Sequence, residues 1–178
     1  MAIPNSLIAS STVDSETAIS DKEIEKAAAE AKKLKNQFVI VGRAIPEKRL
    51  DLAMRLISYV ELDLIIVTSH DAINELKDAA RQLGVAEKVH FESGLSNEKL
   101  FAIIAESKAL FMLSKREGLS LNTIEALALG TPVVALDSTM LPEEVKQHCT
   151  IIKESDMKAG MVDFVKSYEK IKLTASKF

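Results

Sequence analysis

Three cationic side chains, Arg43, Lys48 and Arg49, follow closely on the apolar run Phe38–Val41. Pro46 fits the first turn of a helix, where its missing N–H would have no partner. Cations at a helix start oppose the helix dipole, whereas a bound anion would use both the cations and the free N–H groups. The pattern therefore indicates a phosphate or diphosphate site, with Arg43 gripping two oxygens and Lys48 acting as a point charge. The alternative is solvated surface charge.

Two carboxylates, Glu117 and Glu125, lie further along the chain. Glu125 interrupts the apolar segment 124–129, and a lone carboxylate there needs either solvent or a hydrogen-bonding partner such as the vicinal hydroxyls of a ribose. Glu117 lies in a turn, where a polar group of a ligand would arrive. The free N–H groups of Gly118, Leu119 and Ser120 would form a second anion-binding helix start. The alternatives are a solvent-facing stripe for Glu125 and a surface loop for Glu117.

The elements that must position these residues follow from apolar runs that alternate with amphipathic stretches. The runs are dense in Val, Ile and Leu, as in strands buried on both faces; they are Phe38–Val41, Leu64–Val67, Val89–Phe91, Ala109–Leu113, Val133–Leu136 and Thr150–Ile152. The stretches between them predict helices at about 47–60, 71–83, 97–106, 120–129 and 157–172. This alternation predicts an α/β fold, a Rossmann-like doubly wound parallel sheet in three layers (α/β/α).

In such a sheet a ligand binds beyond the carboxyl ends of the strands, where the strand order reverses. A strand order of 3-2-1-4-5-6 would make the first and fourth predicted strands neighbours at that point. The loops that follow them are Gly42–Lys48 and Ser114–Gly118. We therefore expect the candidate residues of the two loops to meet.

The amino-terminal part of the chain is of a different kind. Residues 1–20 are rich in serine and contain no Lys or Arg, and we interpret them as a linker or edge segment. Ser20 and Glu23 form a capping-box pattern, which predicts a helix over about 21–35. We interpret residues 21–178 as a single Rossmann-like domain.

Composition excludes several classes of protein. The 178 residues are 47% hydrophobic, which is typical of a globular chain, and no apolar run is long enough to span a membrane. A formal charge of −3 argues against nucleic acid as the main partner. One cysteine and three scattered histidines favour neither a disulfide nor a metal site. We expect a protein of a reducing compartment, cytoplasmic, with no metal and no cofactor.

The sequence resembles the carboxyl-terminal domain of family 4 glycosyltransferases, which are retaining enzymes of the GT-B fold. The similarity covers roughly residues 36–147. Four segments carry it: the strand and loop at 38–52, the E-x7-E motif at 117–125, the continuation Ala-Leu-Ala-Leu-Gly-Thr-Pro-Val-Val-Ala at 126–135, and Leu-Pro-Glu at 141–143. The segments 84–91 and 94–100 fit the intervening region.

The resemblance implies a role for each matched position. Arg43 and Lys48 would bind the donor diphosphate and stabilise the leaving group, beside Gly118 and Leu119, and Glu117 would contact the donor sugar as a further catalytic residue. Glu125 would hold the ribose, and the base would lie near Gly94 and Leu95. The implied reaction is that of a hexosyltransferase: transfer of a sugar from a UDP-, GDP- or ADP-sugar with retention, in polysaccharide or glycoconjugate biosynthesis, without a metal.

The sequence also departs from the family pattern. The segments Gly118–Asn122, Thr68–Asp71 and Lys146–Thr150 replace glycine-bearing stretches of the family, and the chain has no room for the amino-terminal, acceptor-binding lobe. Ile3-Pro-Asn5 resembles the short signature that precedes this domain in the family. The chain is therefore expected to be a fragment, or one subunit of a split enzyme. The full enzyme would be peripheral to a membrane if the missing lobe binds one. We expect the isolated chain to bind a donor without turnover, with that lobe as its partner in cis or in trans. The alternative is a non-catalytic partner or stabilising module.

Overall fold

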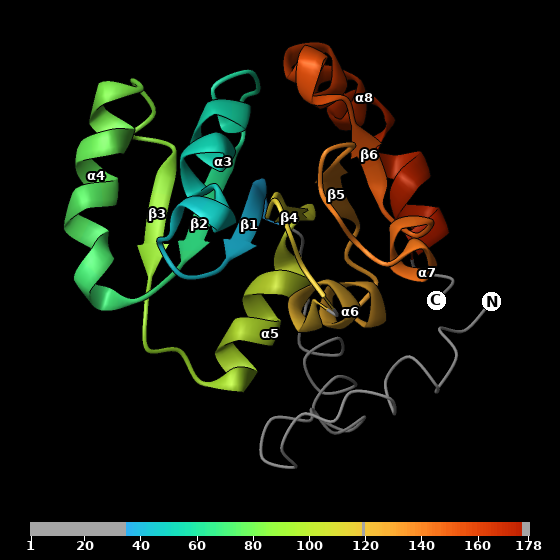
Figure 1. Cartoon of the computed structure of the whole chain (residues 1–178), viewed down its shortest axis with the longest axis horizontal. Helices are drawn as coiled ribbons and strands as arrows, with labels where there is room; N and C mark the ends of the chain where they lie inside the picture. The colour runs from blue at the N-terminus through green and yellow to red at the C-terminus, as the bar shows by residue number, and fades with distance from the viewer. Residues whose placement is uncertain (1–34, 119, 176–178) are drawn as a thin grey trace.

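The computed structural model describes residues 35–118 and 120–175 (Figure 1). The strands are β1 (Gln37–Val41), β2 (Asp63–Val67), β3 (Val89–Glu92), β4 (Ala109–Met112), β5 (Val133–Leu136) and β6 (Thr150–Ile152). The helices are α3 (Leu50–Ile57), α4 (Ile73–Gln82), α5 (Asn97–Glu106), α6 (Leu121–Ala128), α7 (Glu143–Lys146) and α8 (Met157–Ala175). The linker predicted at 1–20, and all but the last residue of the helix predicted at about 21–35, lie outside the described residues.

The six strands form one parallel sheet, as the sequence predicts, and their order is β3-β2-β1-β4-β5-β6, the order under which the candidate loops are expected to meet. β1 pairs with β4 in a register that sets Phe38 opposite Ala109 and Val39 opposite Leu110. The chain therefore leaves β1 and β4 at the same edge of the sheet, and this is the point at which the strand order reverses.

Helices cover both faces of the sheet. Alternate side chains of β1 point to opposite faces: Phe38 joins a core with α3, α4 and α8, whereas Val39 joins a smaller core with α5 and α6. Figure 1 shows α5 and α6 together on the lower side of the sheet. The rings of Phe38 and Phe111 stack in the larger core, with centroids 4.8 Å apart. Burial on both sides explains why the strands are continuous apolar runs.

Two predicted helices differ from the structure at their boundaries, and one helix was not predicted. The expected helix at 47–60 begins as a 3-10 helix, Pro46–Lys48, and is interrupted at Arg49 before α3 starts at Leu50. The interruption arises because Arg49 adopts a left-handed backbone conformation, which ends one helix and precedes the next. The helix expected at 71–83 likewise opens with a 3-10 helix, His70–Ala72, and α7 lies where only a turn was expected.

None of the helices within the described ranges is long and apolar enough to cross a membrane. The longest, α8, packs Met161 and Phe164 into the larger core.

Candidate functional site

The loop after β1 places Lys48 close to the sheet edge. Gly42 continues the β1–β2 pairing through its N–H, which donates to the carbonyl of Val67 at 3.0 Å. The Lys48 stem then folds back over Gly42: a Cβ added to Gly42 would lie 3.4 Å from both Cγ and Cδ of Lys48. The 3-10 helix Pro46–Lys48 makes this return possible: Lys48 lies in the first turn of a helix that begins at Pro46, but that turn is a 3-10 helix.

The loop after β4 is tied down on two sides. The N–H of Lys115 donates to the carbonyl of Glu47 in the β1 loop at 3.0 Å. A parallel bridge pairs Arg116 with Met140, in which the N–H of Glu117 donates to the carbonyl of Met140 at 3.2 Å. Backbone hydrogen bonds therefore fix the direction in which the Glu117 side chain leaves the loop.

Lys48 and Glu117 meet at this point and form an ion pair between Nζ and Oε1. Their side chains are only 27% and 15% exposed, respectively, so solvent screens the pair less than it would at the open surface. The sequence predicts that each side chain contacts a ligand. The structure places them beside each other in one polar cluster at the carboxyl ends of β1 and β4.

A hollow of about 350 Å³ is lined in part by Gly42, the residue over which the Lys48 stem folds. Its lining brings together residues from three loops, namely Val41, Gly42, Arg43, Val67, Thr68, Ser69, Gly94, Leu95 and Leu100. Arg43, predicted as a phosphate ligand, thus shares a hollow with Gly94 and Leu95, predicted beside a base. Its guanidinium is one of the cationic groups that an anion reaching this edge of the sheet would meet.

Glu125 lies on α6, which is capped by Ser120: the Ser120 hydroxyl accepts a hydrogen bond from the N–H of Thr123. The Glu125 side chain is half-buried, and its Oε2 is a buried oxygen with no hydrogen-bond partner among the described residues. Burial raises the pKa of this carboxyl from 4.5 to about 7. Gly118 is exposed just ahead of the helix, and Leu119 lies outside the described residues.

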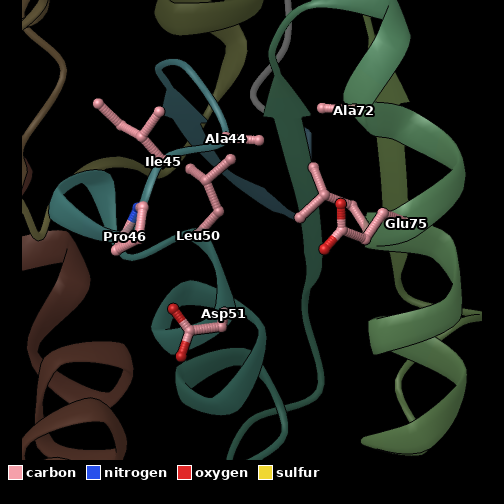
Figure 2. Close-up of a pocket in the computed structure, with 8 residues that line it drawn as sticks. Ala44, Ile45, Pro46, Leu50, Asp51, Ala72 and Glu75 are labelled. Atoms are coloured by element: carbon pink, nitrogen blue, oxygen red, sulfur yellow. The ribbon is translucent and has the colours of Figure 1, made fainter.

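A second hollow, of about 230 Å³, lies between the β1 loop and α4 (Figure 2). Figure 2 shows that its polar lining includes the carboxylates of Asp51 and Glu75, from α3 and α4. None of its eight lining residues is Lys or Arg. Two carboxylates with no cation beside them would repel a phosphate group. This hollow therefore fits the predicted anion less well than the hollow lined by Arg43.

Sequence reasoning missed Thr68, which lines the larger hollow and follows β2. The Thr68 hydroxyl is buried and has no hydrogen-bond partner among the described residues. It also missed Met140, whose backbone holds the Glu117 loop. Neither a threonine nor a methionine by itself indicates a binding site in a sequence. Only the position of Thr68 directly after a predicted strand offered a clue.

Across residues 35–118 and 120–175, no group of three or more His, Cys, Asp or Glu side chains is arranged to hold a metal ion.

Comparison with known proteins identifies relatives of known activity. At 30% identity over 118 residues, the chain resembles an MMP alpha-(1->4)-mannosyltransferase of Mycolicibacterium hassiacum, with 64% of this chain and 29% of the relative covered. At 33% identity over 119 residues, it resembles a GDP-mannose-dependent alpha-(1-6)-phosphatidylinositol monomannoside mannosyltransferase of Mycolicibacterium smegmatis, with 60% and 31% covered. The chain thus spans less than a third of these relatives.

Solved structures share the fold. WaaG, a glycosyltransferase involved in lipopolysaccharide biosynthesis, superposes with a TM-score of 0.66 at 16% identity, over 90% of this chain and 46% of WaaG. HepE of Anabaena, solved in complex with UDP-glucose, gives a TM-score of 0.65 at 15% identity, over 89% of this chain and 47% of HepE. The six-stranded parallel sheet is therefore that of GT-B glycosyltransferases, as the sequence predicts.

The family described as "Glycosyl transferases group 1" matches residues 21–172, which is most of the chain and includes both loops of the polar cluster. This chain belongs to the group 1 glycosyltransferases.

Proposed function

We propose that this chain is the donor-binding domain of a retaining glycosyltransferase that uses a nucleotide sugar. The observation that carries the proposal is the Lys48–Glu117 pair at the reversal point of the strand order, beside the hollow lined by Arg43. The pair offers both a cation for a diphosphate and an acceptor for sugar hydroxyls.

Each candidate residue has a role in this proposal. Arg43 and Lys48 bind the diphosphate, together with the N–H groups of Gly118 and Leu119. Glu117 accepts hydrogen bonds from the donor sugar. The ribose lies against Glu125, whose buried Oε2 then gains the hydroxyl partner that it lacks in the protein alone. The hollow at Gly94 and Leu95 takes the base.

In the proposed reaction the main role of the cations is to stabilise the negative charge of the leaving diphosphate. The bond between the anomeric carbon and the diphosphate oxygen breaks, and the electron pair leaves with the diphosphate. The acceptor hydroxyl forms the new bond on the same face of the sugar, and its proton passes to the departing phosphate. Lys48 stabilises the negative charge as it grows on the leaving group, because it is held in place before the reaction begins.

The names of the relatives and of the solved structures suggest which nucleotide sugars to consider as the donor. One relative is named for GDP-mannose, and the solved structures include complexes with UDP and with UDP-glucose. We therefore propose a hexose linked to GDP or UDP, and we retain ADP as a third nucleotide to test.

We further propose that turnover requires a second, acceptor-binding lobe, supplied in cis or in trans. The chain covers 46% of WaaG, which leaves room for such a lobe in proteins of this type. The isolated chain is then expected to bind a donor without transferring its sugar. Sugar transfer by the isolated chain, measured with radiolabelled donors, would contradict this part of the proposal.

Calorimetric titration with UDP, GDP and ADP tests donor binding. We expect saturable binding of one nucleotide by the wild-type chain and loss of that binding in an Arg43→Ala/Lys48→Ala double variant. A Lys158→Ala variant serves as the matched control, because Lys158 is an exposed cation on α8 outside the candidate site. Failure of a folded sample to bind any of the three at millimolar concentration would favour a non-catalytic partner module instead.

A further inference from the structure

Arg49, the residue directly after Lys48, has an unusual backbone conformation. Its φ and ψ are 55° and 44°, and it is the one non-glycine residue with positive φ in the described ranges. A side chain with a Cβ rarely adopts this left-handed conformation, because the Cβ crowds the following carbonyl. A strained backbone of this kind persists only where the surrounding structure holds it.

The contacts of the Arg49 side chain account for that support. Its guanidinium grips both oxygens of Glu154: Nη1 lies 3.2 Å from Oε2, and Nη2 pairs with Oε1. The hydroxyl of Ser138 also donates to Oε2 of Glu154. Glu154 is held in turn, because its N–H donates to Oδ1 of Asp137 at 2.9 Å. The Arg49 side chain is only 14% exposed, whereas the Glu154 side chain is 36% exposed, so solvent screens the pair from the side of Glu154.

Lys48 and Arg49 are therefore anchored to different parts of the sheet. Lys48 pairs with Glu117, which follows β4, whereas Arg49 pairs with Glu154, which follows β6. The left-handed residue between the 3-10 helix and α3 sets the angle at which Lys48 leaves the chain. Movement of Arg49 would therefore move Lys48 away from Gly42 and Glu117.

We propose that Glu154, acting through its bidentate pair with Arg49, is a positioning residue that holds Lys48 in place for the donor diphosphate. Its ligand-binding consequence rests on the proposed function, whereas the fixed position of Lys48 does not. Glu154 itself lies outside the polar cluster and touches no group proposed to contact the donor.

The pair persists over the pH range of an ordinary experiment. Hydrogen bonds from Arg49 and Ser138 lower the pKa of Glu154 from 4.5 to about 2. The charged groups that face Glu154 are the paired Arg49 and, at longer range, Lys115. Glu154 therefore stays ionised at neutral pH, and a variant that removes its charge compares two well-defined states.

Amide hydrogen exchange on the full chain tests the positioning directly. The N–H groups of Lys48 and Arg49 donate to the carbonyls of Ile45 and Pro46, at 3.0 and 3.3 Å. In Glu154→Ala we expect both to exchange at least tenfold faster, and in Glu154→Asp we expect partial rescue, because the carboxylate is retained. Asp78→Ala is the matched control: it removes the carboxylate of an exposed Arg81–Asp78 pair on α4 and should leave both rates unchanged.

A double-mutant cycle then separates positioning from general support. The probe is whichever of UDP, GDP and ADP binds the wild-type chain. We expect Glu154→Ala to weaken its binding about tenfold in the wild-type background and less than twofold in a Lys48→Ala background, because Glu154 acts through Lys48. Equal weakening in both backgrounds would overturn the proposal, as would exchange rates within twofold of wild type in Glu154→Ala.

Two further outcomes are informative. If Glu154→Ala fails to fold, Arg49→Gly takes its place, since glycine adopts a φ of 55° without strain and the variant still lacks the pair. Exchange at Lys48 should then rise less than tenfold but more than twofold, and wild-type rates would overturn the proposal. If no nucleotide binds the wild-type chain, the proposed function fails, and the exchange rates alone decide whether Glu154 positions Lys48.

Discussion

The loop after β4 and the helix that follows it each hold one carboxylate, and the protein treats the two in opposite ways. Glu117, in the loop, pairs with Lys48. Glu125, on α6, buries an oxygen with no hydrogen-bond partner among the described residues, and burial raises its pKa to about 7. A compensated charge costs little to keep, whereas a buried carboxyl without a partner destabilises the fold until a ligand satisfies it. The loop is therefore prearranged, whereas the helix becomes satisfied only when a donor binds.

Removal of Lys48 should have the largest effect, because it abolishes the difference between the two carboxylates: both Glu117 and Glu125 then lack a partner. Lys48→Ala removes a charge-assisted hydrogen bond to the diphosphate and leaves the Glu117 charge facing the ligand. We expect the affinity for the nucleoside diphosphate to fall about 100-fold, which corresponds to about 2.7 kcal/mol. Isothermal titration calorimetry at fixed ionic strength measures the change.

Lys158→Ala provides the control for a lost surface cation, and should keep the wild-type affinity. Glu117→Gln in the Lys48→Ala background should recover part of the loss, since it removes the uncompensated charge. A Lys48→Ala variant that binds as well as wild type would show that the pair plays no part in donor binding.

The next largest effect should come from Glu125→Gln, on stability rather than on binding. The folded pKa of Glu125 lies above its unfolded value, so its contribution to stability is fully present below about pH 4.5 and is lost as pH rises through about 7. At pH 8 we expect the variant to be more stable than wild type by about 1–3 kcal/mol, allowing for partial solvent screening. Denaturant unfolding at pH 5 and pH 8 measures the difference.

The gain should shrink towards zero at pH 5, where Glu125 is protonated in the folded protein. Glu117→Gln is the matched comparison, because its carboxylate is paired: it should destabilise the protein, or leave it unchanged, at pH 8. A pH-independent gain in Glu125→Gln would mean that packing, rather than charge, explains the effect.

A smaller effect should appear in the pH dependence of nucleotide binding. Glu125 accepts ribose hydroxyls best when ionised, so a donor must displace its proton below about pH 7. We expect wild-type affinity to fall as pH decreases below 7, by at most tenfold per pH unit, and to level off above it. In Glu125→Gln this contribution should vanish. Because protonation of the nucleotide phosphate affects both proteins equally, only the difference between their pH profiles tests the prediction; identical profiles would contradict it.

The sheet was predictable from the sequence because its strands are continuous apolar runs. A run such as Phe38–Val41 is apolar throughout because helices cover both faces of the sheet. Sequence reasoning also placed the candidate loops at one sheet edge, on the condition of a 3-2-1-4-5-6 strand order, which the structure has. The two loops were expected to meet, but the Lys48–Glu117 ion pair itself was not predicted, because each residue was considered as a ligand contact or as surface charge and not as a partner of the other. The left-handed turn at Arg49 was missed because the partner of its side chain, Glu154, lies 105 positions away in the chain.

Thr68 gives the smallest expected effect and extends the comparison to the larger hollow. Its buried hydroxyl resembles Glu125 rather than Glu117, since it has no hydrogen-bond partner among the described residues. Thr68→Val keeps the shape and removes the hydroxyl, so the ligand-free protein should gain up to about 1 kcal/mol of stability. If the hydroxyl contacts the donor, nucleotide binding should weaken about 3- to 10-fold in the same variant. Thr131→Val is the matched control, because the Thr131 hydroxyl donates to the carbonyl of Ile104 at 2.9 Å, and its loss should lower stability without changing affinity. Equal stability and equal affinity in Thr68→Val would instead mean that solvent satisfies this hydroxyl, so that Thr68, unlike Glu125, does not wait for a donor.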